Sequence, residues 1–309
     1  MKNKIYIIHE NDEWVEPLRR ELKDINASFE EWHLGKRNID YLDKPPQGIF
    51  YNRMSASSHT RGHRYAPEYT AVVLNWLEKN NRRVINNSRA LLLELSKSLQ
   101  YKELEKVGLK VPNTVYAQNK EELLQLGKIF PFPYLTKHNR AGRGLGIKLF
   151  HDYQSFKQYI NSNEFEKSID GITLLQEYIK PKTNTIIRTE FVNSKFLYAV
   201  QVDTSEGFEL CPADDCNLED KFCPANATGN KFMILDNFSN PILEQYQKVL
   251  KNNHIKIAGI EFLEDIKGQL YTYDINTNTN YNSNAENFSE LKGMKAIANY
   301  LKQELEQQR

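Results

Sequence analysis

The feature that most constrains the fold is a change of pattern near residue 88. Before it, short apolar runs alternate with segments whose apolar residues recur at helical spacing. After it, strand-like segments follow one another through short turns. Alternating strands and helices are typical of a parallel α/β sheet, whereas consecutive strands are typical of antiparallel sheets. We therefore expect a small parallel domain over residues 1–87 and a larger α+β domain over residues 88–309.

The first domain is predicted to contain four strands and two helices. The strands are expected at residues 5–9, 29–34, 48–53 and 83–86. Asp12 is expected to cap the first helix, and Pro67 to open the second, because the N–H that proline lacks is unpaired there in any case. Sheets of this kind bind ligands beyond the carboxyl ends of their strands, so Arg53 and the polar loop after it predict a substrate site.

The second domain is expected to be rich in hairpins. Strands are predicted at residues 132–138, 145–150, 173–179, 185–192, 195–202, 258–264 and 269–276. Asn193-Ser194 and residues 266–268 are predicted hairpin turns. A helix is expected to begin at Ser88 and to continue through Leu99. Further helices at residues 153–160, 241–250 and 286–301 would cover one face of the strands.

Composition excludes several classes of protein. Lys and Arg total 41 against 40 for Asp and Glu, a net charge of +1, so nothing favours a nucleic-acid partner. The 40% of hydrophobic residues argues against general disorder. No apolar run approaches the roughly 18 residues of a membrane span, which leads us to expect a cytoplasmic protein. The three cysteines, Cys211, Cys216 and Cys223, are expected to be free thiols rather than a disulfide framework, because their number is odd and no secretory signal is recognised. Their spacing also fits no common zinc pattern.

A glycine-rich stretch lies between two predicted strands. Lys137 ends the first strand, and Gly142, Gly144 and Gly146 follow before the second. Glycines let the backbone approach phosphate oxygens, and lysine adds a positive charge, so a phosphate-covering hairpin is one interpretation. It is neither a Walker A loop nor a dinucleotide fingerprint, because no helix follows the glycines. A flexible turn is the other interpretation, and the motif leaves both open.

Acidic and amide side chains lie on the last two predicted strands. Asp274 and Asn276 are two residues apart and share a face, and antiparallel pairing can set Glu261 beside them. Three oxygen donors of this kind suit Mg²⁺. In the alternative interpretation Glu261 faces solvent and Asp274 caps a turn.

Two weaker signals concern a nucleotide. Backbone groups around Gln176 and Glu177, at the end of an apolar strand, could bind an adenine edge, and Arg188 could neutralise a transferring phosphoryl group. Taken singly, such an arginine is more often a surface ion-pair residue. His59 and His63, in a polar loop, are interpreted as a substrate-facing or solvated pair rather than as metal ligands.

The order of these features resembles the ATP-grasp superfamily, and most closely its RimK-like glutamate ligase and glutathione synthetase-type branch. The features are, in sequence, Lys97, Lys137 with the glycine-rich hairpin, residues 176–179, Arg188, Glu261 and the Asp-Ile-Asn at 274–276. The resemblance implies a small parallel pre-ATP-grasp domain followed by a two-subdomain ATP-grasp fold with antiparallel sheets. The first subdomain would span about residues 112–180 and carry the hairpin, and the second would span about residues 181–309 and carry the metal site.

The resemblance also implies roles for individual residues. The phosphates of ATP would be contacted by Lys97, Lys137, Gly142, Gly144 and Gly146, and adenine would be held by Gln176, Glu177, Tyr178 and Ile179. Two Mg²⁺ ions, which Mn²⁺ could replace, would be bound by Glu261, Asp274 and Asn276. The catalytic residues would be Arg188 and Lys137, and the substrate would be faced by Arg53, Arg61, Arg64 and Asn278.

The implied activity is that of an ATP-dependent carboxylate–amine ligase. A substrate carboxylate would attack the γ-phosphorus, and an amine would convert the resulting acylphosphate into an amide. The substrate would be an amino acid or a peptide, and a homo-oligomer is compatible with this activity. Two alternatives remain open: a nucleotide-binding protein that has lost turnover, and a phosphotransferase acting on a hydroxyl.

Three departures from the family pattern bear on these alternatives. Ile186 stands where relatives place an aspartate for the ribose, which leaves Asn184 as a possible replacement. Asp274 stands where the second metal carboxylate is usually a glutamate. The loop at 210–217, with Asp214 and Asp215, replaces a loop that contains arginine and asparagine in relatives. We expect these acids either to bind the ammonium of the acceptor or to indicate a substrate other than an acidic peptide tail.

Overall fold

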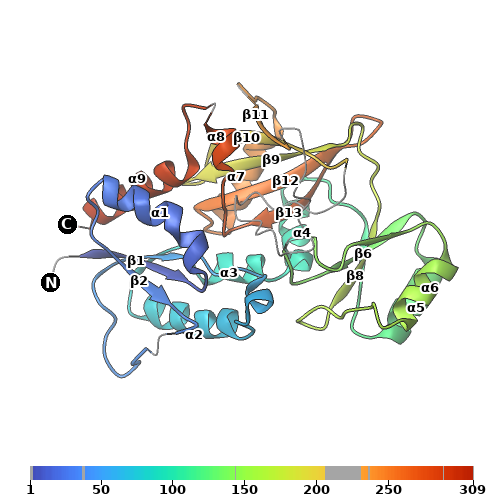
Figure 1. The fold of residues 1–309 in the computed structure, drawn as a ribbon, viewed down its shortest axis with the longest axis horizontal. Helices are drawn as coiled ribbons and strands as arrows, with labels where there is room; N and C mark the ends of the chain where they lie inside the picture. The colour runs from blue at the N-terminus through green and yellow to red at the C-terminus, as the bar shows by residue number, and fades with distance from the viewer. Residues whose placement is uncertain are drawn as a thin grey trace.

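The computed structural model describes residues 3–36, 39–142, 144–205, 231–235, 237–287 and 289–308. These residues form one parallel and two antiparallel sheets, which lie side by side along the molecule (Figure 1). The expected combination of a parallel α/β part with antiparallel α+β parts is confirmed.

The N-terminal sheet has the order β2-β1-β3-β4 and is parallel throughout. Its strands are β1 (Lys4–His9), β2 (Phe29–His33), β3 (Gly48–Asn52) and β4 (Arg83–Ile85), and its helices are α1 (Asp12–Asp24) and α2 (Ala66–Lys79). A short 3-10 helix, η1 (Ser58–Arg61), lies in the loop after β3. Asn11, not Asp12, caps α1: its side chain accepts hydrogen bonds from the N–H groups of Glu13 and Trp14.

The C-terminal helix completes the hydrophobic core of this N-terminal sheet. Leu18 and Leu22 of α1 pack in one cluster with Ile297 and Leu301 of α9 (Gly293–Glu306), on the face of the sheet opposite α2 (Figure 1). The bounds of the helix predicted at 286–301 are wrong. The structure has a separate short helix, α8 (Ser283–Glu286), before α9. The proposed boundary between residues 87 and 88 remains a prediction.

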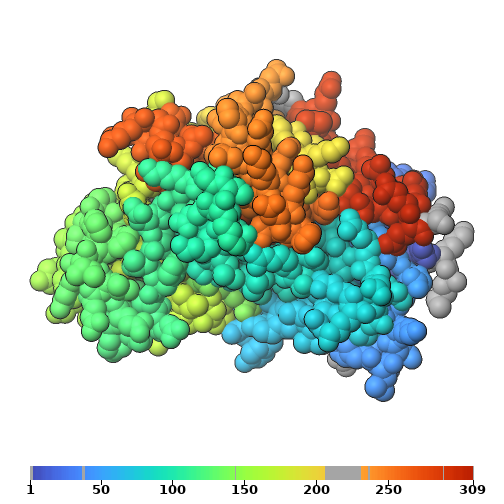
Figure 2. Space-filling model, turned by 180° about the vertical axis from the view of Figure 1, so that it is seen from behind, coloured from blue at the N-terminus to red at the C-terminus, as the bar shows by residue number. Residues whose placement is uncertain are grey.

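The helix expected from Ser88 through Leu99 is two helices in the structure. Asn87 caps α3 (Ser88–Glu94), and α4 (Lys97–Lys106) begins after a break at Ser96, whose backbone is extended. The Lys97 N–H bonds the carbonyl of Asn139, so a tertiary contact holds the break. Seen from behind, the segment from β4 to α4 lies between the N-terminal part and the β5 to β8 part (Figure 2).

The second sheet carries the glycine-rich hairpin. Its order is β5-β8-β6-β7, with β5 (Thr114–Ala117), β6 (Tyr134–His138), β7 (Lys148–Phe150) and β8 (Thr173–Glu177). Two helices, α5 (Lys120–Ile129) and α6 (Tyr153–Asn161), pack on it through a buried aromatic core that includes Tyr134, Phe150 and Phe156. The sequence analysis predicted neither β5 nor α5.

The third sheet has the order β11-β10-β9-β12-β13. Its strands are β9 (Thr185–Val192), β10 (Lys195–Asp203), β11 (Phe232–Leu235), β12 (Ile257–Glu264) and β13 (Leu270–Asn276), and α7 (Ile242–Asn252) packs against it. Asn193 and Ser194 have φ values of 53° and 56°, the left-handed conformation of a tight two-residue hairpin, as predicted.

Some sequence predictions fall outside the described residues. They concern Cys211, Cys216, Cys223, Asp214 and Asp215, which all lie between residues 206 and 230. Within the described ranges, no helix is both long and apolar enough to cross a lipid bilayer.

Candidate functional site

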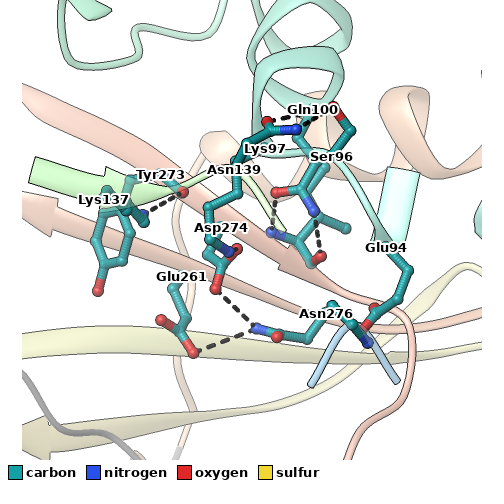
Figure 3. A network of polar contacts seen from close by, with 12 residues as sticks. Glu94, Ser96, Lys97, Gln100, Lys137, Asn139, Glu261, Tyr273, Asp274 and Asn276 are labelled. Carbon is teal, nitrogen blue, oxygen red and sulfur yellow. Dashed lines mark hydrogen bonds and ion pairs between the residues drawn. The ribbon is translucent and has the colours of Figure 1, made fainter. Parts of the chain in front are cut away.

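Strands β12 and β13, called the acidic strands below, bring the side chains of Glu261, Asp274 and Asn276 together. In the β12–β13 pair, Glu261 lies opposite Asp274, and a register shift follows Glu261. Asn276 Nδ2 lies 3.4 Å from Glu261 Oε1 and 3.5 Å from Asp274 Oδ2 (Figure 3). Glu261 is only 6% exposed. The structure thus places Glu261 in the interior rather than toward solvent.

Two cations compensate these carboxylates. Lys97 Nζ, at the start of α4, lies 2.5 Å from Asp274 Oδ1. Arg188 pairs with Glu261 in the β9–β12 register, and its Nη1 donates to Glu261 Oε1 at 2.9 Å, while its Nε donates to Glu190 Oε1 at 2.5 Å. Arg188 is therefore a buried residue of the site and not a surface ion-pair residue.

The surroundings shift the pKa values of the two carboxylates, Glu261 and Asp274, in opposite directions. Burial raises the pKa of Glu261, although the Arg188 guanidinium opposes the change. Burial also acts to raise the pKa of Asp274, but Lys97 and Lys137 outweigh it and hold that pKa below its usual value. Burial lowers the pKa of Lys137. Asp274 is accordingly the ionised carboxylate at neutral pH, as a cation ligand must be.

The donor set fits a magnesium ion. Glu261 and Asp274 supply carboxylate oxygens, and Asn276 supplies an amide whose oxygen and nitrogen exchange places on a half turn of the side chain. All three line one cleft of about 970 Å³, part of which is open to solvent. Oxygen donors in a cleft that also admits phosphates are the usual surroundings of Mg²⁺.

The glycine-rich hairpin borders the same cleft. Lys137, on β6, is buried, with its Nζ 3.4 Å from the Tyr273 carbonyl oxygen. Gly144 and Gly146 both have φ of 75°, a conformation that side chains disfavour. Gly142 and Gly144 line the cleft opposite Glu261 and Asp274.

The predicted adenine segment lies apart from this cleft. Gln176 Nε2 donates to the Tyr101 hydroxyl at 2.7 Å, and the Tyr178 N–H donates to the Pro133 carbonyl at 3.1 Å. The N–H of Ile179 has no backbone acceptor among the described residues. None of the four residues 176–179 lines the cleft that contains the acidic strands, so their assignment to adenine stays a prediction.

Arg53 connects the N-terminal domain to the loop that follows β13. It is 2% exposed, and its Nε donates to Asn278 Oδ1 at 3.1 Å. Its Nη2 donates to the Thr279 carbonyl at 3.0 Å and to Asn280 Oδ1 at 2.9 Å. Asn278 and Asn280 line the cleft. The structure therefore gives Arg53 a set of neutral partners within the protein, and its proposed contact with substrate stays a prediction.

The other two predicted substrate arginines contact carboxylates of the protein. Arg61 Nη2 lies 2.5 Å from Glu10 Oε1, and Arg61 stacks over Trp14 at 4.4 Å. Arg64 Nη1 lies 2.8 Å from Glu68 Oε1. A substrate carboxylate would have to compete with these partners.

Glu94 is a residue of the site that the sequence analysis missed. Its carboxylate accepts hydrogen bonds from the N–H groups of Ala56 at 3.2 Å and Thr277 at 2.7 Å, and these bonds join the loop after β3 to the loop after β13. Burial raises its pKa. The available signal was an acidic residue within the apolar run at 91–95.

The arrangement of charges, hairpin and acidic strands agrees with the comparison to known families. Residues 95–210 match the model of the RimK-like ATP-grasp domain. This segment, a little over a third of the chain, is similar to RimK-like ATP-grasp domains. A comparison with curated proteins finds no match.

Solved structures share the fold of this chain over nearly its whole length. The ATP-grasp ligase PsnB, complexed with a minimal precursor, has a TM-score of 0.68 at 12% identity and covers 97% of this chain and 99% of its own. A RimK domain protein from Sphaerobacter thermophilus has a TM-score of 0.64 at 12% identity, with 96% and 98% covered. A RiPP-associated ATP-grasp ligase from Chryseobacterium gregarium, with ADP and a leader and core peptide, has 0.63 at 15%, with 98% and 97% covered.

Proposed function

We propose that the protein is an ATP- and Mg²⁺-dependent ligase that joins a carboxylate of a peptide to an amine. One observation carries the proposal: Glu261, Asp274 and Asn276 converge in a cleft that Lys97, Lys137 and Arg188 also line. Oxygen donors for a divalent cation and fixed positive charges for phosphates are the two requirements of phosphoryl transfer from ATP.

The residues of the cleft would act mainly by position and charge. When bound, ATP supplies the phosphoryl group and Mg²⁺ neutralises charge on its oxygens. Arg188 is held on two sides by Glu190 and Glu261, so its guanidinium has a fixed orientation before any ligand arrives. A pre-oriented cation of this kind stabilises developing negative charge without reorganising during the reaction. The glycine hairpin brings backbone groups toward the phosphates from the other side.

A peptide is the proposed source of the carboxylate. It is supported by the similar ATP-grasp ligases, whose structures contain a precursor in one case and a leader and core peptide in another. Of the two arginines that pair with carboxylates of the protein, Arg64 has the partner that is easier to exchange, because Glu68 is half exposed. Arg61 is bound to the buried Glu10, which is harder to displace.

An ADP-release assay with a panel of peptides and amines tests the proposal. We expect turnover to require both substrates, and hydroxylamine in place of the amine to give a hydroxamate, because it traps an acylphosphate. Asp274→Asn should remove turnover and leave the fold unchanged by circular dichroism. The control is Asp24→Asn, the same change at an exposed position at the end of α1.

Two results would contradict this function. Full activity in Asp274→Asn would disprove the metal assignment. ATP binding by calorimetry, without ADP release on any substrate pair, would instead favour a nucleotide-binding protein without turnover. The buried Ile186 of β9 motivates this second reading, since it stands where relatives have a ribose-binding aspartate.

A further inference from the structure

A second group of metal-binding side chains lies at the carboxyl edge of the N-terminal sheet. His9 ends β1, His33 ends β2, and Asp12 is the first residue of α1. One ring nitrogen of each histidine and one carboxylate oxygen of Asp12 all lie within 4.8 Å of one another. None of these residues lines the cleft of Glu261 and Asp274.

The backbone holds the two histidines in this arrangement. In the parallel pair of β1 and β2, His9 lies directly beside His33, and their ring centroids are 5.0 Å apart. Asp12 follows His9 by three residues, at the point where the chain turns from β1 into α1. Two strands and one helix therefore present their donors to a common point without any change in the backbone.

The imidazole of His9 is buried without a hydrogen-bond partner. His9 is 2% exposed, and neither its Nδ1 nor its Nε2 has a hydrogen-bond partner among the described residues; the same is true of His33 Nδ1. A buried polar atom without a partner is costly, so such atoms are usually satisfied by a ligand, an ion or water. One of the His9 nitrogens lies within 4.8 Å of a His33 nitrogen and of an Asp12 carboxylate oxygen, an arrangement that indicates a ligand that accepts lone pairs.

The charged residues next to the cluster, Glu31 and Lys36, do not satisfy the unpartnered imidazole nitrogens. Glu31 Oε2 lies 3.5 Å from His9 Nε2, but the Glu31 carboxylate is bound by Arg19 through two hydrogen bonds of 2.7 and 2.8 Å. Lys36 Nζ lies 2.7 Å from Asp12 Oδ2, so a cation already occupies one side of the cluster. The Lys36 side chain is 64% exposed and can move into solvent when another cation binds.

We propose that His9, Asp12 and His33 form a transition-metal site, and that Zn²⁺ is the ion it suits best. Two imidazole nitrogens and one carboxylate oxygen are a common ligand set of zinc, with a fourth position left for water. Mg²⁺ prefers oxygen donors only, so this site and the cleft of Glu261 and Asp274 select different ions. The inference does not depend on the ligase activity.

Calorimetric titration of the nucleotide-free full chain with zinc chloride tests the site. We expect one Zn²⁺ per chain at the cluster. His9→Gln and His33→Gln should each weaken binding by at least about 10- to 100-fold, the loss that even outer-shell changes cause at zinc sites. The matched control is His151→Gln, the same change at an exposed histidine after β7, which should leave the affinity unchanged.

Two further variants separate this site from other ligands for zinc. Asp274→Asn should keep zinc binding at the cluster, because it alters only the cleft. Replacement of Cys211, Cys216 and Cys223 by serine should also keep it, because the proposed ligands include no thiolate. If either variant no longer binds one Zn²⁺ per chain, the ion binds at the altered residues and not at the cluster, and the proposal is overturned.

Lys36 offers a test with the opposite sign. Lys36→Ala removes the ammonium that competes for Asp12, so we expect zinc to bind several-fold more tightly than to the natural chain. The measurement is made with the three cysteines replaced by serine, so that thiols exposed by unfolding cannot account for tighter binding. The proposal is overturned if zinc does not bind, or if His9→Gln and His33→Gln both bind it as the natural chain does.

Discussion

Lys97 Nζ lies 2.5 Å from Asp274 Oδ1, although 177 residues separate the two in sequence. The contact joins the first residue of α4 to β13, and it neutralises one of the two carboxylates of the candidate metal site. The same lysine therefore stabilises the fold, and its contact with phosphate stays a prediction.

Replacing Lys97 should destabilise the protein through Asp274. Both side chains are largely buried, and breaking a buried ion pair from one side costs up to about 3–5 kcal/mol of unfolding free energy. We expect Lys97→Met to show a loss of this order in urea unfolding. The double variant Lys97→Met with Asp274→Asn should recover part of it, because no uncompensated charge remains. Strict additivity of the two single changes would contradict this account.

Gly259→Ala should impair activity without altering any proposed ligand. A Cβ at Gly259 would lie 2.5 Å from Arg188 Nη2, so the guanidinium must move away from Glu261. A displacement of about 1 Å can reduce a rate roughly 100-fold, and we expect a fall in kcat of roughly 10- to 100-fold. Gly268→Ala, in the β12–β13 hairpin turn, is the control for backbone strain away from Arg188: its φ is 82°, but its Cβ would meet Glu264 Oε1 only at 3.6 Å. Equal effects of the two changes on kcat would argue against the role of Arg188.

The glycines of the hairpin should differ in their tolerance of a side chain. Gly146 has φ of 75°, and a Cβ there would lie 2.2 Å from His138 Cδ2. Gly146→Ala should strain the hairpin by at least about 1–2 kcal/mol and raise the KM for ATP. At Gly142 a Cβ would meet Ser57 Cβ at an ordinary 3.5 Å, so Gly142→Ala should have the smaller effect. Steady-state kinetics with varied ATP would compare the KM values of the two variants. A larger increase in KM for Gly142→Ala than for Gly146→Ala would contradict the proposal that the hairpin covers the phosphates.

Arg53→Lys should lower stability despite keeping the charge. Arg53 uses its planar guanidinium to bond Asn278, Thr279 and Asn280, and an ammonium cannot make the same set of hydrogen bonds. Buried donors and acceptors left unsatisfied cost about 1–3 kcal/mol. Thermal and urea unfolding would measure the loss. Arg20→Lys, at an exposed position of α1, should stay within about 0.5 kcal/mol of the natural chain.

Glu68 should give a stability contribution that depends on pH. Burial acts to raise its pKa, but hydrogen bonds from Arg140 and Arg64 prevail and lower the pKa to about 2. Because the folded-state pKa is below the ordinary value of 4.5, the contribution is present above pH 4.5 and is lost as the pH falls toward 2. The carboxylate is half exposed, so Glu68→Gln should cost less than about 1 kcal/mol at pH 7.

Urea unfolding at pH 7 and near pH 2 would check the Glu68 prediction. The difference between the natural chain and Glu68→Gln should shrink at the lower pH, because the Glu68 carboxylate becomes increasingly protonated as the pH approaches its pKa. Glu164→Gln is the control, because Glu164 is 74% exposed and contacts only the exposed Lys148 among the described residues. A difference that grows on acidification would show that the sign is wrong.

Local sequence patterns predicted much of the fold. The strand at residues 185–192 and the Asn193-Ser194 turn were placed correctly, because alternation and left-handed turn residues act over a few positions. The predicted bounds of helices were wrong where tertiary contacts determine where a helix ends. The helix after Ser88 breaks at Ser96 because the Lys97 N–H bonds Asn139, a residue about 40 positions later.

The sequence by itself determined which residues could share a face, such as Asp274 with Asn276, because side-chain alternation along a strand is a local property. Only the tertiary structure decided which residues meet across strands and between separate elements: Lys97 with Asp274, Arg188 with Glu261, Arg53 with Asn278, and His9 with His33. Those pairings depend on strand register and on the packing of separate elements. The energy of a buried charge is set by the neighbours that this packing supplies, not by the residues beside it in the chain.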